Sequence, residues 1–229
     1  IENTAYPNGN THGSIIDING QYYIFDHRFT NNSSYCRQGV AEKINIEKDG
    51  YIHQAEATSC GLNNASLDAC GTYPAYITCH VRNLSLTPDI TKEDRLLLMP
   101  YVTQDGDDRE AGDDQYIKNI QNGCIIGYKY FNFDKQQSKK ILIKINIKGT
   151  AKGYISITTD MDYADKEFKD YNKNASTYID ISDTLHNNNS DNWKTIELHL
   201  SNPAGIKPLY FMFEGTGAFS IRDFTFIPD

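Results

Sequence analysis

The dipeptide Asn19-Gly20 constrains the fold of this chain more than any other feature, because it separates two strand-like runs. Residues 15–18 alternate, with Ile16 and Ile18 on one face, and residues 21–25 are aromatic and β-branched. Asn and Gly both accept the positive φ angles of a two-residue turn, so the pattern predicts a β-hairpin. Strand ends often carry functional residues, and four polar residues flank this hairpin: His12, Asp26, His27 and Arg28.

A β-meander is expected to continue from the hairpin. The polar loop 29–35 is followed by an alternating run, 37–46, a charged turn, 47–50, and a short closing strand, 51–55. Short antiparallel strands joined by tight turns are typical of one blade of a β-propeller. Because one blade cannot close a ring, we expect residues 1–58 to be the C-terminal part of a propeller whose other blades lie outside this chain.

Residues 97–229 contain strand-like runs at the spacing of a β-sandwich or jelly roll. A strand at 97–103 is followed by runs at 124–133, 140–147, 153–158, 176–181, 194–200, 209–213 and 219–226, with turns such as 148–150 and 202–205. One run alternates cleanly and places Ile141, Ile143, Ile145 and Ile147 on a single face. We therefore predict an all-β protein whose second domain, 97–229, is a β-sandwich.

Residues 59–96 are expected to connect the two domains and to wrap back along the second one. Alternating apolar residues favour a strand within 73–81, and Thr91-Lys92-Glu93-Asp94 has the residue types that begin a helix, although little helix is expected after it. Three of the five cysteines lie close together in this region, and we predict one disulfide among Cys60, Cys70 and Cys79, with buried free thiols as the alternative.

Charge and hydropathy exclude two classes of partner. The formal net charge is −8 and no basic stripe is present to neutralise phosphates, so we expect no nucleic-acid partner. No apolar run reaches the length of a membrane-spanning helix, so we expect no membrane association. The chain begins with Ile1 rather than Met, and we expect it to derive from a longer, secreted precursor.

Two further features have competing interpretations. The only tryptophan, Trp193, stands at the start of a strand, where burial is favoured over stacking on a sugar. The acidic loop at 105–114 lacks the spacing of an EF-hand, so a solvated loop is favoured over a calcium site.

The hairpin motif also carries a family resemblance. His12-Gly13-Ser14-Ile15, with Asn19-Gly20 and His27 after it and Tyr35-Cys36-Arg37-Gln38 beyond, resembles the late part of the catalytic domain of glycoside hydrolase family 43. These enzymes are β-xylosidases, α-L-arabinofuranosidases and arabinanases built on a five-bladed β-propeller. The resemblance implies that His12 helps to coordinate a central cation, commonly calcium, and that Arg37 reaches into the active site. Asp26, His27 and Arg28 are candidates for the rim of the substrate pocket, with ordinary turn residues as the favoured alternative.

A second resemblance covers about residues 97–229. Asn122-Gly123-Cys124, Asp191-Asn192-Trp193 and Phe219-Ser220-Ile221, with the segments around them, resemble a family 6 carbohydrate-binding module, a β-sandwich often fused behind family 43 domains. Two departures weaken the implied function. The strand near 101–103 lacks the glutamates that help to hold a structural calcium in the family, and Ser220 stands where the family usually has a sugar-binding Asn.

Catalytic carboxylates cannot be assigned in this sequence. Inverting hydrolysis needs a general acid and a general base, and in the family these residues precede the hairpin. Glu2 stands too close to His12 to be placed as the acid. We therefore expect the C-terminal portion of a hydrolase acting on arabinoxylan or xylan oligosaccharides, with the missing N-terminal propeller portion as a partner when it is a separate chain. The alternatives are a carbohydrate-binding module or a purely structural sandwich.

Overall fold

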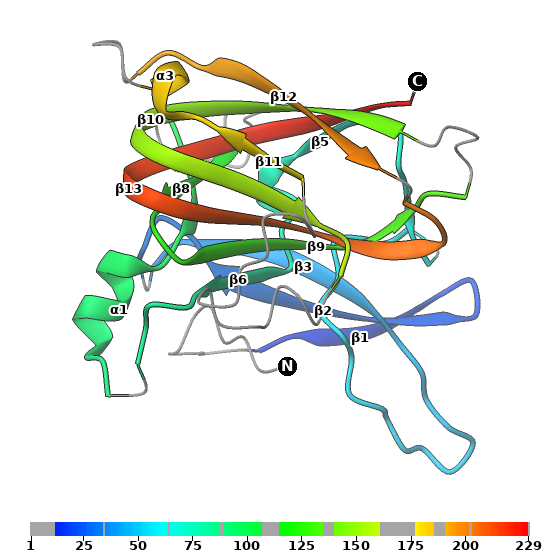
Figure 1. Ribbon diagram of the computed structural model, residues 1–229. Helices are drawn as coiled ribbons and strands as arrows, with labels where there is room; N and C mark the ends of the chain where they lie inside the picture. The colour runs from blue at the N-terminus through cyan, green and yellow to red at the C-terminus, as the bar shows by residue number, and fades with distance from the viewer. Residues whose placement is uncertain are drawn as a thin grey trace.

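The computed structural model describes residues 12–33, 35–63, 65–87, 89–106, 115–134, 140–160, 177–185, 191–201 and 203–228. Strands dominate these residues, which confirms the all-β prediction. They form two sheets, one of three strands and one of ten. Figure 1 shows the small sheet lying beneath the large one, which turns back on itself.

The small sheet, called here the N-terminal sheet, contains β1 (Ser14–Ile18), β2 (Gln21–Phe29) and β3 (Arg37–Ile44) in sequence order. Asn19 and Gly20 form the predicted turn with φ angles of 56° and 83°. The carboxylate of Asp17 accepts a hydrogen bond of 2.6 Å from the Gly20 amide. The closing strand expected at 51–55 is wrong, because only an isolated bridge between Ile46 and Ile52 forms there.

Two long antiparallel strands, β10 (Lys140–Thr158) and β13 (Ile206–Pro228), build the large sheet. Their pairing runs from Ile141 opposite Pro228 to Thr158 opposite Tyr210. Both ribbons turn back on themselves in Figure 1, so each strand contributes to two layers. The predicted turn at 148–150 and the predicted break between 213 and 219 are therefore wrong, because both strands continue through them.

The remaining strands pair with the two halves of this ladder. In one layer, β12 (Lys194–Ser201) pairs with the first half of β10, and β5 (Gly71–Pro74) and β8 (Gln115–Ile120) pair with the second half of β13. β8 also pairs with β7 (Tyr101–Gln104). In the other layer, β11 (Thr177–Asp180) pairs with the second half of β10, and β9 (Cys124–Asn132) pairs with the first half of β13. β9 also pairs with β6 (His80–Asn83) and β4 (Leu67–Asp68). The result is a β-sandwich made from one continuous sheet.

The core lies between the two layers. Ile141, Ile143, Ile145 and Ile147 are each fully buried, which confirms the predicted alternation in this strand. Aromatic rings come from both layers: Tyr128 on β9 and Phe224, which pairs with Ile145, have ring centroids only 4.7 Å apart. Burying such side chains contributes roughly 1.5–3 kcal/mol each, so this cluster dominates the stability of the sandwich.

Glycines allow the two long strands to cross closely where they bend. Gly153 and Gly217 both have positive φ, at 143° and 77°. A methyl group at Gly153 would overlap the carbonyl oxygen of Glu214, and one at Gly217 would overlap that of Thr150. The sharp bend therefore requires residues without a side chain at these positions.

The segment expected to be a connection, 59–96, adds secondary structure to the sandwich. Besides β4, β5 and β6 it contains a 3₁₀ turn, η1 (Ala75–Ile77), and two turns of helix, α1 (Lys92–Leu98). The strand expected over 73–81 is interrupted by η1. The predicted helix start is confirmed, because the Thr91 hydroxyl accepts a hydrogen bond of 3.1 Å from the Asp94 amide.

All five cysteines are free, so the predicted disulfide among Cys60, Cys70 and Cys79 is wrong. The thiol of Cys60 instead lies 3.5 Å from the Lys129 carbonyl oxygen, and that of Cys79 lies 3.6 Å from the Gly127 carbonyl oxygen. Burial raises the pKa of Cys79 to about 11, so this thiol stays protonated. None of the described helices is long and apolar enough to cross a membrane.

A matched pair of glycine substitutions tests the bend. Gly217 and Gly205 share a φ of 77°, but only Gly217 lies against the backbone of another strand. We expect Gly205→Ala to lower the free energy of unfolding by about 1 kcal/mol, and Gly217→Ala by about 3 kcal/mol because the overlap adds to the backbone strain. Urea unfolding curves measure both values, and equal losses would show that the close crossing is absent.

Candidate functional site

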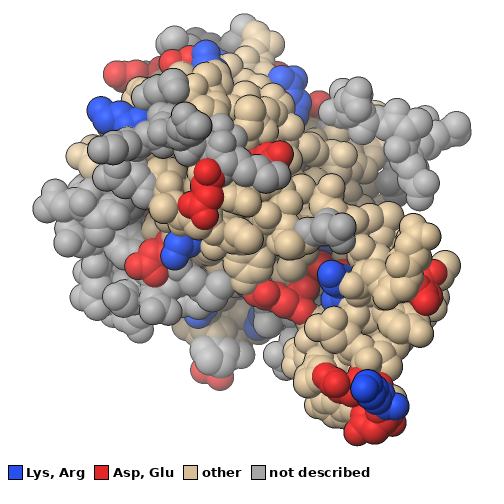
Figure 2. Space-filling view, turned by 90° about the vertical axis from the view of Figure 1, so that its right-hand side faces the viewer, with Lys and Arg blue, Asp and Glu red and all other residues tan. Residues whose placement is uncertain are grey.

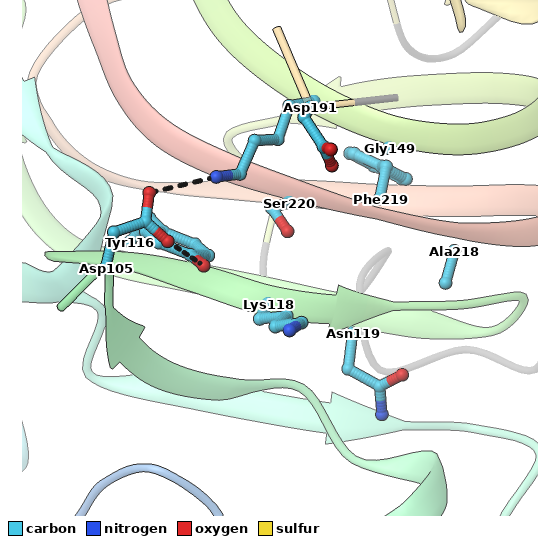
Figure 3. Close-up of a pocket in the computed structure, with 10 residues that line it drawn as sticks. Asp105, Tyr116, Lys118, Asn119, Gly149, Asp191, Ala218, Phe219 and Ser220 are labelled. Atoms are coloured by element: carbon cyan, nitrogen blue, oxygen red, sulfur yellow. Dashed lines mark hydrogen bonds and ion pairs between the residues drawn. The ribbon is translucent and has the colours of Figure 1, made fainter. Parts of the chain in front are cut away.

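A pocket of about 320 Å³ opens at the end of the sandwich where the long strands bend. Charged, polar and aromatic side chains line it, as Figure 3 shows: Asp105, Tyr116, Lys118, Asn119, Lys148, Gly149, Asp191, Ala218, Phe219 and Ser220. Mixed polar groups beside aromatic rings suit a ligand with many hydroxyl groups.

The register of the strands explains why these residues meet. β10 and β13 slip by one residue, since Asn146 faces Asp223 while Ile147 faces Ile221. The extra residue is Arg222, which forms a β-bulge. Beyond the bulge, Lys148 faces Ser220 directly. Ile147 also pairs with Lys194, so Trp193 comes next to Lys148 on the other side.

Two pocket residues, Tyr116 and Lys148, form a cluster with the neighbouring Trp193. The ring centroids of Tyr116 and Trp193 are 5.3 Å apart, with the planes at 76°. The Lys148 ammonium lies 4.6 Å from the centroid of Tyr116 and 4.7 Å from that of Trp193. The guanidinium carbon of Arg222 is 5.1 Å from the centroid of Trp193. Two cations therefore contact one indole ring, an arrangement that the ring quadrupole favours.

Asp105 holds the lysine and the tyrosine in place. Its carboxylate accepts a hydrogen bond of 2.8 Å from the Tyr116 hydroxyl and lies 3.1 Å from Lys148 Nζ, as the dashed lines in Figure 3 indicate. Burial alone would raise the pKa of Asp105, but the Tyr116 hydroxyl and the Lys148 ammonium hold it below its usual value. Burial and the same carboxylate raise the pKa of Tyr116, so the phenol stays neutral.

Sequence analysis identified this pocket only in part. Trp193 is partly exposed and belongs to the aromatic pair, whereas burial was favoured, and Ser220 lines the pocket as its motif suggested. Tyr116 and Lys148 were missed, because their meeting depends on a bulge that no short-range pattern reveals. Of the acidic loop, Asp105 belongs to the pocket, while residues 107–114 lie outside the described residues.

The candidates from the hairpin motif gather at one end of the N-terminal sheet, where β2 ends and β3 begins. The ring centroids of His12 and His27 are 5.0 Å apart, and those of His27 and Phe29 are 6.5 Å apart. The guanidinium carbon of Arg37 lies 3.9 Å from the centroid of Phe29. The side chains thus form a row in which His12 contacts His27, and Phe29 contacts both His27 and Arg37.

Asp26 and His27 are more buried than a pocket rim requires. Their side chains are 10% and 16% exposed, and Asp26 accepts a hydrogen bond of 2.7 Å from the His27 amide. His27 Nε2 is buried without a hydrogen-bond partner among the described residues. A buried imidazole nitrogen left without a partner costs free energy, so this atom needs a group outside the described residues.

The described residues do not assemble a metal site around His12. No group of three or more His, Cys, Asp or Glu side chains in this part of the chain is placed to hold a metal ion. Calcium takes six to eight oxygen ligands, whereas His12 offers one nitrogen. His12 alone fits the role of a single ligand, and the remaining ligands would have to come from elsewhere.

A polar junction attaches the N-terminal sheet to the sandwich. Arg28, expected beside Asp26 and His27 at a rim, instead donates hydrogen bonds to the carbonyl oxygens of Tyr76 and Thr78. It also donates to Gln38 Oε1 at 2.8 and 2.6 Å, and Gln38 donates to Gln115 on β8 at 3.1 Å. A planar guanidinium with five N–H groups suits such a multiple contact.

Glu42 is the second anchor of this junction. Its side chain is buried on β3 and accepts hydrogen bonds of 2.6 Å from the Thr58 amide and 2.8 Å from the Thr58 hydroxyl. Burial raises the pKa of Glu42 to about 7, against the lowering effect of these hydrogen bonds. The junction therefore contains a carboxyl group that titrates near neutral pH.

Comparison with known proteins covers both parts of the chain. The family model of Carbohydrate binding module (family 6) matches residues 101–228. A protein described as "Xylosidase/arabinosidase" from Thermoclostridium stercorarium is 36% identical over 232 residues, which cover 100% of this chain and 44% of that protein. The chain thus spans less than half the length of this curated relative.

A solved structure matches the fold over most of the chain. The crystal structure of a glycoside hydrolase family 43 arabinoxylan arabinofuranohydrolase from Bacillus subtilis, in complex with cellotetraose, matches with a TM-score of 0.55 and 19% identity. The match covers 96% of this chain and 41% of that chain. It includes the N-terminal sheet as well as the sandwich.

The junction predicts a pH dependence of stability. Because the pKa of Glu42 rises from 4.5 to about 7 on folding, the folded state binds the proton more tightly, and stability falls as the pH rises through this window. We expect the free energy of unfolding of the wild type to fall by up to about 3 kcal/mol between pH 4.5 and pH 7.5, and Glu42→Gln to remove this fall. Urea unfolding curves across this pH range measure the free energy of unfolding, with the exposed Glu197→Gln as control. Parallel profiles for wild type and Glu42→Gln would contradict the assignment.

Proposed function

The chain belongs to the carbohydrate binding modules of family 6, and from this premise we propose that it is the C-terminal portion of a glycoside hydrolase. The enzyme would cleave xylosyl or arabinofuranosyl bonds in oligosaccharides derived from arabinoxylan and xylan. The observation that carries this proposal is the match to a xylosidase/arabinosidase over the entire chain, N-terminal sheet included. A free-standing binding module has no need for that sheet.

Exposed apolar side chains on the N-terminal sheet support the proposal. Ile15 and Tyr22 lie on one face of β1 and β2 and are 45% and 39% exposed, while Ile16 lies on the other face and is 49% exposed. Exposed apolar side chains on a sheet mark a surface that another element covers. We propose that this element is the preceding part of a β-propeller, supplied by the same polypeptide or by a separate chain.

The cluster at the end of this sheet would then border the active site. The Arg37 guanidinium is suited to bind sugar hydroxyl groups or to orient a carboxylate, and the unpartnered His27 Nε2 is available to a group on the upstream part. Asp26 would hold the His27 backbone in place. We propose His12 as one ligand of a calcium ion completed by that upstream part. The acid and base for inverting hydrolysis would come from there as well.

The sandwich would bring the enzyme to its substrate. We propose a plant cell-wall polysaccharide or oligosaccharide as the partner of this module, and a secreted location for the protein that uses it. The pocket at the bend is the candidate contact, because its lysine, amide, hydroxyl and carboxylate groups can bond to sugar hydroxyls. Among the described residues on the face that Figure 2 shows, Lys and Arg are scattered between acidic residues and form no continuous basic patch.

Kinetics of the complete protein test this proposal. We expect activity on 4-nitrophenyl α-L-arabinofuranoside or β-D-xyloside, and a loss of about 100-fold in kcat/KM for Arg37→Ala, because a charged contact to the reacting sugar is removed. Arg95→Ala on α1, away from the hairpin cluster, is the matched control.

Two results would contradict the proposal. Absence of activity on both substrates would contradict the hydrolase assignment. Equal kcat/KM for Arg37→Ala and Arg95→Ala would remove Arg37 from the active site, and Arg37→Lys would show whether charge alone is enough.

A further inference from the structure

We infer that Lys148 occupies the space beside the Tyr116–Trp193 pair and prevents sugar rings from stacking there. Lys148 would thereby determine which carbohydrates the module binds. The inference rests on the proposed carbohydrate-binding role of the sandwich. It adds a residue that decides specificity within the pocket.

The position of the ammonium group carries the inference. Lys148 Nζ lies almost equally far from the two ring centroids, at 4.6 and 4.7 Å. The lysine side chain is only 16% exposed, although its partner Asp105 is 59% exposed. Lys148 is therefore packed into the space beside the two rings rather than extended into solvent.

Stacking on a sugar needs the same space. A pyranose ring binds an aromatic side chain by laying its face of C–H groups on the ring at van der Waals distance. A ring bound there would have to displace Lys148 from both aromatic contacts and from the Asp105 carboxylate 3.1 Å away. Each cation–π contact in a partly buried site is comparable to the gain from one stacked sugar, so displacement cancels that gain.

The open side of the pocket remains available. Lys118, Asp191 and Ser220 line it and carry hydrogen-bonding groups without a free aromatic face, while the Asn119 amide beside them donates to the carbonyl oxygens of Leu97 and Met99. This chemistry suits a terminal sugar or short branch held by its hydroxyl groups, and it disfavours a long chain held by stacking.

The chain contains its own reporter for the test. Trp193 is the only tryptophan, so intrinsic fluorescence reports directly on the aromatic pair. We would titrate the chain with xylohexaose and compare wild type with Lys148→Ala. Lys118→Ala is the matched control, because Lys118 lines the same pocket but makes no ring contact among the described residues.

The expected result is a gain of affinity. Lys148→Ala should bind xylohexaose about tenfold more tightly than wild type and shift the emission of Trp193, because the cation that contacts both rings is gone and Arg222 remains beside Trp193 alone. Lys118→Ala should show no gain. Acrylamide should also quench Trp193 more strongly in Lys148→Ala than in wild type, without any sugar present.

Several outcomes would overturn the inference. Weaker or unchanged xylohexaose binding by Lys148→Ala would show that Lys148 supports binding or is irrelevant to it. Lys148→Met keeps the apolar stem without the charge. If Lys148→Ala does not fold, the affinity of Lys148→Met for xylohexaose is compared with that of wild type instead, and a gain is again expected. If no variant binds xylohexaose, the inference fails, while hydrolysis by the complete protein still tests the proposed function separately.

Discussion

The ladder between β10 and β13 is the interaction on which the rest of this structure depends. Eighteen pairs of residues join these strands, from Ile141 opposite Pro228 to Thr158 opposite Tyr210. Because both strands bend together, one ladder supplies the central strands of both layers and encloses the core. The β-bulge at Arg222 shifts the pairing register of all the residues beyond it by one. The pocket therefore depends on both the bend and this shift in the ladder.

The polar junction determines how the two candidate sites relate. Arg28 and Glu42 fix β2 and β3 against residues 58–78, and Asn31 on the neighbouring loop donates a hydrogen bond of 2.8 Å to Val102. Three separate polar contacts leave little freedom for the N-terminal sheet to rotate on the sandwich. A carbohydrate bound in the pocket would therefore have a defined direction relative to the end of the sheet that carries His12, His27 and Arg37.

Sequence analysis succeeded where the folding signal is local. Asn19-Gly20 needs only its own backbone preferences to form a turn, and the isoleucines from 141 to 147 need only the two-residue period of a strand. It failed where glycine and cysteine have more than one role. Lys148-Gly149-Thr150 resembled a turn, but Gly149 serves the close crossing of two continuous strands. The clustered cysteines suggested a disulfide, whereas Cys60 is buried as a small apolar group and Cys70 is an exposed free thiol.

The pocket shows the limit of short-range reasoning most clearly. Tyr116, Lys148 and Trp193 come from three strands or their ends, and each is unremarkable in its own segment. Their meeting requires the pairing of β8, β10, β12 and β13 in one register, which is a property of the folded sheet. The hairpin cluster is more local, because one turn places His12 near His27 and the next loop pairs Arg37 on β3 with Phe29 on β2.

The anomeric configuration of the released sugar tests the central claim most directly. Proton NMR of the complete protein acting on arabinoxylan would follow the first product before it mutarotates. The account predicts release of arabinose or xylose with the configuration opposite to that of the cleaved bond, as an inverting hydrolase requires. Release with retained configuration, or no release of either sugar, would contradict it.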